Sequence, residues 1–193
     1  MPFVTRLLLC TAFILTITTQ LSGCVTAVAG GAAAGGALAL DRRTAGIYLE
    51  DENIEIKASQ QLRKALNEEA HVNVTSYNLN VLLTGEVPNQ EAKVEAENIV
   101  KATESVRNIT NELVVGPKSS ITDRGNDTYL TSKIKAKFVA EKDFAPNNVK
   151  IVTEASTVYL LGIVSTHEAN LAAEIARTTD GVAKVVKVFE YTN

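Results

Sequence analysis

Hydrophobic residues recur at every fourth position in two stretches of the chain: Ile54, Ala58, Leu62 and Leu66, and then Leu130, Ile134 and Phe138. Residues four apart lie on the same face of an α-helix, so each stretch predicts an amphipathic helix that buries one side. Each predicted helix precedes short segments rich in β-branched residues, which are typical of strands.

These β segments come in pairs, at 72–75 with 81–87 and at 149–152 with 158–164. The turn-prone residues within each pair predict two hairpins. A further helix is predicted over about 90–103 and again over about 167–179, followed by last strands at about 106–115 and 182–191. The order helix, strand, strand, helix, strand is therefore written twice, which is the signature of an internal repeat.

The repeat predicts an α+β fold of two tandem αββαβ modules, at 46–115 and 124–193. Each would have a small three-stranded mixed sheet covered on one face by two helices. The segment 116–123 contains Gly, Pro and Ser and is assigned as the linker. Ser165 and Glu168 predict a capping box at the start of a helix in the second module. Gly85 and Gly162 occupy matching strand positions and are interpreted as sites of a bulge or close backbone approach, with a ligand contact as the alternative.

The N-terminal segment predicts export. Arg6 precedes an apolar run at 7–17, which is shorter than the roughly 20 residues that span a bilayer. With the small residues that follow, residues 1–23 are typical of a secretory signal peptide. The sequence Leu-Ser-Gly at 21–23 followed by Cys24 resembles a bacterial lipobox. That resemblance implies a lipid-modified Cys24 at the mature N-terminus, and an ordinary signal peptide with an incidental cysteine is the alternative.

Residues 24–45 would then form a lipidated, flexible tether, because the glycine pairs within 25–40 disfavour regular structure. A membrane-associated or helix-packing segment is the alternative. Val25 follows the cysteine, whereas Asp there would resemble an inner-membrane retention signal, so an outer-membrane destination is expected. Cys10 leaves with the signal peptide, and the mature chain then has no second cysteine for an internal disulfide.

Composition argues against several functions. The chain has no Trp, 5% aromatic residues and a formal net charge of −3, which disfavours nucleic acid as a partner. His71 and His167 occupy non-equivalent positions in the two modules, so we expect two surface histidines and no metal site. The acidic run at 50–52 is interpreted as a solvated lead-in to a helix, with attraction of a cation as the alternative. With no catalytic constellation or phosphate-binding loop in the sequence, we expect no catalytic residues, no cofactor and no small-molecule substrate.

The segments Leu-Thr-Gly-Glu-Val at 83–87 and Leu-Leu-Gly-Ile-Val at 160–164 resemble the BON domain, a small αββαβ module of exported bacterial proteins. With the lipobox, the chain resembles the dual-BON lipoproteins of the Gram-negative outer membrane. The resemblance implies a lipid-anchored protein whose body faces the periplasm, binding to phospholipid membranes, and a role in envelope integrity.

Charge distinguishes the two modules. Residues 53–116 carry 6 basic and 9 acidic residues, a net −3, whereas residues 127–193 carry 8 of each, a net 0. The additional lysines gather on the first helix of the second module. The predicted site for an anionic phospholipid membrane lies on that helix and consists of Tyr129, Lys133, Lys135, Ala136 and Lys137.

The matching helix of the first module has Asn53, Ser59 and Gln61 where the second has Tyr129, Lys135 and Lys137. An ordinary solvated helix is the alternative interpretation of these differences. The alternative function is a scaffold that binds an outer-membrane or cell-division protein through a sheet edge or a helix face.

Overall fold

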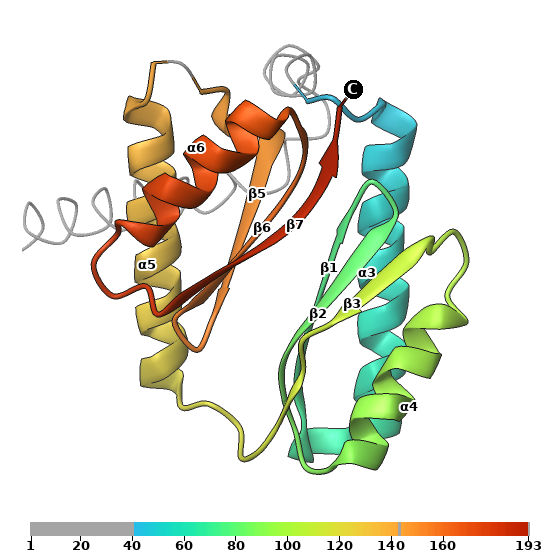
Figure 1. The fold of residues 1–193 in the computed structure, drawn as a ribbon. Helices are drawn as coiled ribbons and strands as arrows, with labels where there is room; N and C mark the ends of the chain where they lie inside the picture. Colours follow the sequence, from blue (N-terminus) through green and yellow to red (C-terminus); the bar gives the residue numbers. More distant parts are fainter. Residues whose placement is uncertain (1–40, 143, 193) are drawn as a thin grey trace, which may run out of the picture. The chain divides into compact units, whose positions relative to one another are not determined.

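The computed structural model describes residues 41–142 and 144–192, and residues 41–193 form one compact unit. The predicted signal peptide, Cys24 and most of the predicted tether therefore lie outside the described residues. Within the described part, the predicted α+β architecture of two αββαβ modules is confirmed (Figure 1).

The first module consists of α3 (Ala45–Leu66), the 3-10 turn η3 (Asn67–Glu69), β1 (His71–Tyr77), β2 (Asn80–Val87), α4 (Gln90–Lys101), β3 (Asn108–Asn111) and β4 (Val114–Val115). The second consists of α5 (Ile121–Ala140), the 3-10 turn η4 (Pro146–Asn148), β5 (Val149–Glu154), β6 (Thr157–Val164), α6 (Thr166–Arg177) and β7 (Lys184–Tyr191). Helix α5 begins inside the segment 116–123 that the sequence assigned to the linker.

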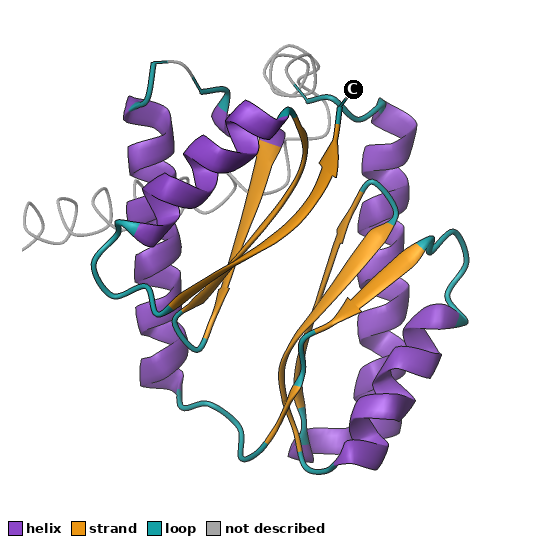
Figure 2. Cartoon of the chain, in the orientation of Figure 1, coloured by secondary structure: helices purple, strands orange, loops and turns teal. Residues whose placement is uncertain are grey.

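Both sheets are mixed and have the second strand of the module at their centre (Figure 2). Strand β2 pairs antiparallel with β1 and parallel with β3 and β4. Strand β6 likewise pairs antiparallel with β5 and parallel with β7. Two helices cover one face of each sheet, α3 and α4 in the first module and α5 and α6 in the second (Figure 1).

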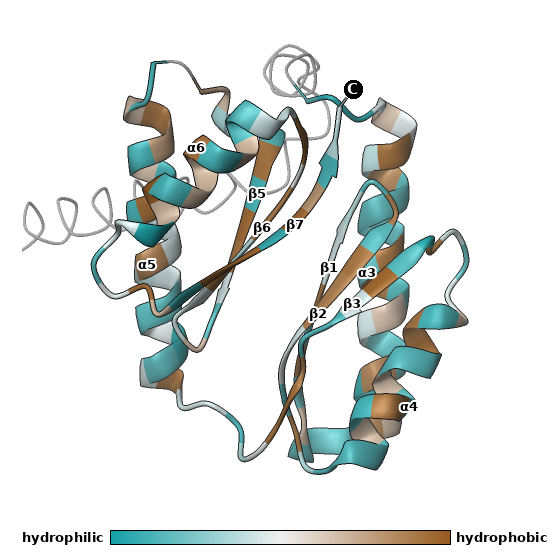
Figure 3. Cartoon of the chain, viewed as in Figure 1, coloured by the Kyte–Doolittle hydropathy of each residue, from teal (hydrophilic) through white to brown (hydrophobic). Residues whose placement is uncertain are grey.

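Each module has its own hydrophobic core between its helices and its sheet. Leu62 of α3 and Phe138 of α5 occupy matching places in these cores, with 3% and 1% exposure. Apolar residues concentrate along the central strands and on the sheet-facing sides of the helices (Figure 3). The two predicted helical stripes are therefore the buried faces.

A third apolar cluster joins the two sheets, which the sequence did not predict. Its buried members are Tyr77 and Leu82 of the first module with Tyr159 and Leu161 of the second. Side chains of a strand alternate between the two faces of its sheet, so Leu82 points away from the core that takes Val81 and Leu83. The face of each sheet without helices is thus covered by the other module.

The structural interpretation of the two strand glycines is confirmed. Gly85 has a φ of +113°, and a Cβ there would lie 2.0 Å from the carbonyl oxygen of His71. A Cβ at Gly162 would lie 2.3 Å from the carbonyl oxygen of Asn148. Both positions bring backbones so close together that no side chain fits.

Asp51 corrects the expectation that the acidic run at 50–52 is solvated. Its side chain is buried, with 2% exposure, and accepts hydrogen bonds from the backbone N–H groups of Asn78 and Leu79, both at 2.8 Å. Those two residues form the β1–β2 turn with φ values of 53° and 66°, as in a two-residue hairpin loop. The expectation fails because helix α3 starts at Ala45, so residue 51 lies in its interior and faces the hairpin.

The second module repeats this arrangement. Asp127 of α5 accepts hydrogen bonds from the backbone N–H groups of Ala155 at 2.9 Å and Ser156 at 2.8 Å. These residues form the β5–β6 turn, also with positive φ values of 47° and 60°. A helix carboxylate therefore holds the hairpin turn in both modules.

Candidate functional site

Helix α5 carries the predicted site, and local sequence fixes where it begins. The Ser120 side chain accepts from the N–H of Asp123 at 3.1 Å, while the Asp123 carboxylate accepts from the N–H of Ser120 at 3.1 Å. This capping box satisfies two backbone donors at the N-terminus of the helix. The buried stripe of Leu130, Ile134 and Phe138 then orients the helix on the core and leaves the opposite side to solvent.

Tyr129 lies on the outward side of α5 with 62% of its surface exposed. Lys133 follows one turn later, and its Nζ lies 5.5 Å from the centroid of the Tyr129 ring. At 3.6 residues per turn, Lys133 is about 40° and Ala136 about 20° around the helix from Tyr129, on either side of it. The structure therefore places these three predicted residues on one face, which we call the Tyr129 face.

Two lysines border this face on the side of α6. Lys133 donates to the carbonyl oxygen of Asp180 at 3.0 Å, and Lys137 donates to that of Thr178 at 3.2 Å. Both carbonyls follow the C-terminus of α6, where the helix dipole favours positive charge. Lys137 lies about 80° around α5 from Tyr129, so it stands at the margin of the Tyr129 face.

Lys135 lies elsewhere. It is about 120° around the helix from Tyr129, away from Lys133. It lines a hollow of about 560 Å³ together with Arg43, Tyr48 and Lys150. The structure thus brings together four of the five predicted residues, with Lys137 at the edge, and separates Lys135 from them.

Two apolar side chains that the sequence analysis did not select extend the exposed surface of α5. Ile121 and Val139 are 82% and 73% exposed, and each lies about 80° from Tyr129 on the side opposite Lys133. The Tyr129 face therefore has an apolar flank on one side and a lysine flank on the other. The signal was present in the sequence, because residues 121 and 139 share one position around the helix once its start at Ser120 is known.

Helix α3 provides the internal comparison. Asn53 is exposed at the place of Tyr129, and Lys57 at the place of Lys133 forms an exposed ion pair with Glu104 at 3.5 Å. The two helices bury the same stripe but differ on the solvent side. Since the fold makes the same demand on both helices, the fold does not account for this difference on the solvent side.

Among the described residues, the one side-chain group spaced to hold a metal ion consists of His71, Glu86 and Glu154, and none of these belongs to α5. No helix in residues 41–142 or 144–192 is both long and apolar enough to cross a membrane.

Two copies of an αββαβ module, each with a mixed sheet and a glycine at the close approach of its central strand, define a tandem α+β repeat protein. The family model of the BON domain matches residues 50–117 and 126–193, one match in each module. The chain therefore belongs to the BON-domain family.

Three relatives extend this result over most of the chain. The outer membrane lipoprotein DolP of Haemophilus influenzae is 41% identical over 182 residues, 93% of this chain and 94% of that protein. The 21 kDa hemolysin of Actinobacillus pleuropneumoniae is 38% identical over 154 residues, 79% of each chain. The osmotically-inducible protein Y of Escherichia coli is 30% identical over 144 residues, 72% of each chain. The chain is a dual-BON outer-membrane lipoprotein of the DolP type, a component of the cell envelope.

Proposed function

We propose that the second BON module binds anionic phospholipid membrane through the Tyr129 face of α5, and that this binding supports the integrity of the outer membrane. The observation that carries the proposal is the exposed Tyr129 beside Lys133, at positions where α3 has Asn53 and a lysine paired with Glu104. This is a binding function without a chemical step.

The chemistry of the face suits a bilayer surface. A tyrosine ring is apolar and its hydroxyl is polar, which favours the boundary between acyl chains and headgroups. Each lysine near an anionic surface contributes on the order of 1 kcal/mol, and this attraction falls as salt screens it. Ile121 and Val139 would add apolar contact on the flank. These terms are modest individually, so the face alone should bind reversibly.

With a lipid anchor, such a modest affinity would be sufficient to keep the Tyr129 face on the membrane surface. If Cys24 carries acyl chains, the tether holds the body close to the membrane and raises its effective concentration there. The Tyr129 face would then decide how the body lies and which lipids it meets, while the anchor would keep the protein on the membrane.

The liposome prediction concerns residues 41–193, the compact unit, without its anchor. Tyr129→Ala combined with Lys133→Glu should reduce co-sedimentation with vesicles containing phosphatidylglycerol, because it removes the interfacial ring and reverses a charge. The matched control is Asn53→Ala with Lys57→Glu on α3, which should bind as the unchanged protein does. Asn53, Lys57 and Tyr129 are exposed and Lys133 is half-buried, so the melting temperatures of both variants should stay close to the original.

The outcome also separates the proposal from the scaffold alternative. Undiminished vesicle binding by the Tyr129→Ala/Lys133→Glu variant would contradict the proposed surface. A specific observation favours the alternative: a largely apolar groove of about 670 Å³ between α3 and α4, lined by Gln61, Val94 and Ile99 among others. A protein partner bound there should be lost on Val94→Glu and retained when α5 is changed.

Cys24 gives a prediction about the anchor. Replacing Cys24 with Ala should abolish lipid modification and leave the protein soluble in the periplasm or unprocessed. Fractionation of the envelope with mass spectrometry of the mature N-terminus measures both effects. Normal processing and recovery of the Cys24→Ala variant in the outer-membrane fraction would reject the assignment of Cys24.

A further inference from the structure

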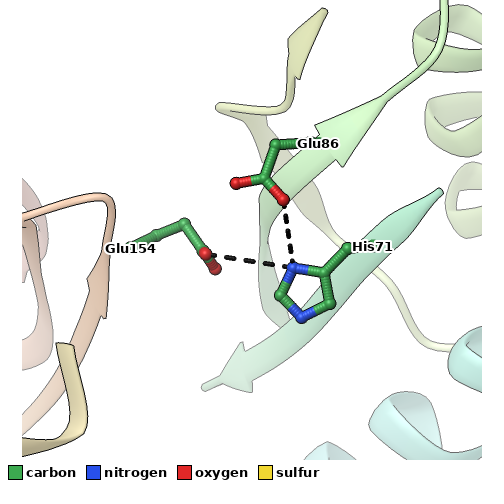
Figure 4. Close-up of side chains that lie close together, drawn as sticks. All are labelled: His71, Glu86 and Glu154. Carbon is green, nitrogen blue, oxygen red and sulfur yellow. Dashed lines mark hydrogen bonds and ion pairs between the residues drawn. The ribbon is translucent and has the colours of Figure 1, made fainter. Parts of the chain in front are cut away.

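Three potential metal ligands meet where the second module packs on the first (Figure 4). Nδ1 of His71 lies 3.3 Å from Oε2 of Glu86 and 3.9 Å from Oε1 of Glu154. The ligand atoms of all three side chains lie within 4.8 Å of one another. His71 begins β1 and Glu86 lies near the end of β2, whereas Glu154 ends β5 of the other module.

Strand pairing and a hairpin turn position these three side chains. His71 and Glu86 face each other as partners in the antiparallel β1–β2 pair, so their side chains lie on the same side of the sheet. Gly85 permits the close approach of the two strands at this point. Glu154 immediately precedes the tight β5–β6 turn, which Asp127 holds through two backbone N–H groups. The positions of the three ligands therefore do not depend on a loop.

Neighbouring donors orient both carboxylates. The amide of Asn73 donates to Oε2 of Glu154 at 2.8 Å, which leaves Oε1 directed at His71. The backbone N–H of Ser119 donates to Oε2 of Glu86 at 3.0 Å. Hydrogen bonds of this kind set the direction of metal ligands, and their loss typically weakens metal binding about 10–100-fold.

Two of the three separations come close to those around a small tetrahedral ion. Zn²⁺ binds nitrogen and carboxylate oxygen at about 2.0–2.2 Å, which separates neighbouring ligand atoms by about 3.3–3.5 Å. The distance between His71 and Glu86 is already 3.3 Å, and that between His71 and Glu154 would have to shorten by about half an ångström. A ligand set of one imidazole and two carboxylates suits Zn²⁺, whereas Mg²⁺ and Ca²⁺ prefer oxygen ligands alone.

Charge gives independent support. Glu154 is 7% exposed, and it lies with Glu86 around the single imidazole of His71. Two partly buried carboxylates share one histidine, so a protonated imidazole would balance one negative charge. A divalent cation would balance both. Arg124 lines the neighbouring hollow of about 220 Å³, where its guanidinium donates to the carbonyl oxygen of Ser119.

We propose that His71, Glu86 and Glu154 form a Zn²⁺ site that links the two BON modules, with water completing the coordination. The metal links the end of β5 to the open end of the β1–β2 hairpin, opposite its turn. It thereby adds a polar connection to the apolar cluster of Tyr77, Leu82, Tyr159 and Leu161. The competing account is an ion pair in which protonated His71 donates to Glu86 and no metal takes part.

Isothermal titration with Zn²⁺ distinguishes the two accounts. The protein is the chain from residue 24 onward with Cys24→Ser, which removes a competing thiol, and without a polyhistidine tag. We expect one Zn²⁺ per chain, bound at least about tenfold more weakly after His71→Gln or Glu154→Gln, and no comparable binding of Mg²⁺. His167→Gln is the matched control, because it removes the other histidine of the chain, and it should leave zinc affinity unchanged.

Thermal unfolding provides a second measurement on the same site. Zn²⁺ that binds the folded state raises the melting temperature, so saturating Zn²⁺ should stabilise the unsubstituted chain and have little effect on Glu154→Gln. Absence of saturable Zn²⁺ binding, or equal affinity in the His71→Gln variant, would overturn the proposal and leave the ion pair.

Discussion

Replacing Phe138 with alanine should lower the free energy of unfolding by about 3–5 kcal/mol, because the change removes buried ring surface and leaves a cavity. Phe138 is 1% exposed and its ring packs against that of Phe144, with centroids 4.6 Å apart. A loss of this size is a large part of the roughly 5–15 kcal/mol that usually stabilises a domain. Denaturant titration followed by circular dichroism measures it.

Leu62 is the matched position in the first module, with 3% exposure. Leu62→Ala should cost about 2–5 kcal/mol, and Val139→Ala, at an exposed position on α5, should cost much less. If Phe138→Ala unfolded at the same denaturant concentration as the unsubstituted protein, the buried face assigned to α5 would be wrong.

Asp51→Ala is the second substitution with a large expected effect, of about 3–5 kcal/mol. The Asp51 carboxylate accepts from Ser76 Oγ at 2.6 Å, from two turn N–H groups, and from Arg43 at 2.8 Å. Removing it leaves buried donors without their acceptor, which costs more than the hydrogen bonds themselves contribute. The melting temperature and denaturation midpoint measure the loss.

Asp127→Ala offers a graded control for that prediction. Asp127 supports the equivalent turn through the N–H groups of Ala155 and Ser156, without the added arginine contact that Arg43 gives to Asp51. Asp127→Ala should therefore lower the free energy of unfolding by less than Asp51→Ala does. Equal stability of the Asp51→Ala variant and the unsubstituted protein would contradict the role assigned to the buried carboxylate.

Most of the fold could be predicted from the internal repeat, because the helix and strand patterns agreed in its two copies. The helical stripes, the paired β segments and the Ser165 capping box all appear where the sequence indicated. The strand expected at about 106–115 is instead divided into β3 and β4, since Leu113 turns into the core with 1% exposure between them. A periodicity of two cannot anticipate such an interruption.

Contacts across the modules were beyond the sequence argument. In the sequence, Leu82 and Leu161 look like ordinary core residues of a strand. No pattern in the neighbouring residues indicates that the two side chains pack in one cluster between the modules. His71 was compared with His167, whereas the structure brings it to carboxylates distant in sequence. The role of Asp51 could have been predicted from the sequence, because Asp51 lies three residues before Ile54 just as Asp127 lies three residues before Leu130. Aligning the polar residues as well as the apolar ones would have exposed the shared turn contact.

For the site, sequence comparison of the two copies identified the exposed Tyr129 and its neighbouring lysine. It also grouped Lys135 with them, because residues close in sequence were taken together before the orientation of the helix was known. About 100° of rotation per residue places Lys135 about 120° around the helix from Tyr129, at a hollow that it lines with Arg43 and Lys150. Geometry therefore narrows the proposed membrane surface to Tyr129, Lys133, Ala136 and the margin at Lys137.

The most direct test of membrane binding uses the absence of tryptophan from this chain. Tyr129→Trp introduces a sole tryptophan on the Tyr129 face, and Asn53→Trp introduces one at the matched position on α3. With vesicles containing phosphatidylglycerol, the tryptophan emission of the Tyr129→Trp variant should shift to shorter wavelength as the ring leaves water, and high salt should reverse the shift. The emission of the Asn53→Trp variant should stay unchanged. A shift in the Asn53→Trp variant with none in Tyr129→Trp would contradict the account, because the membrane would then meet the first module instead of the second.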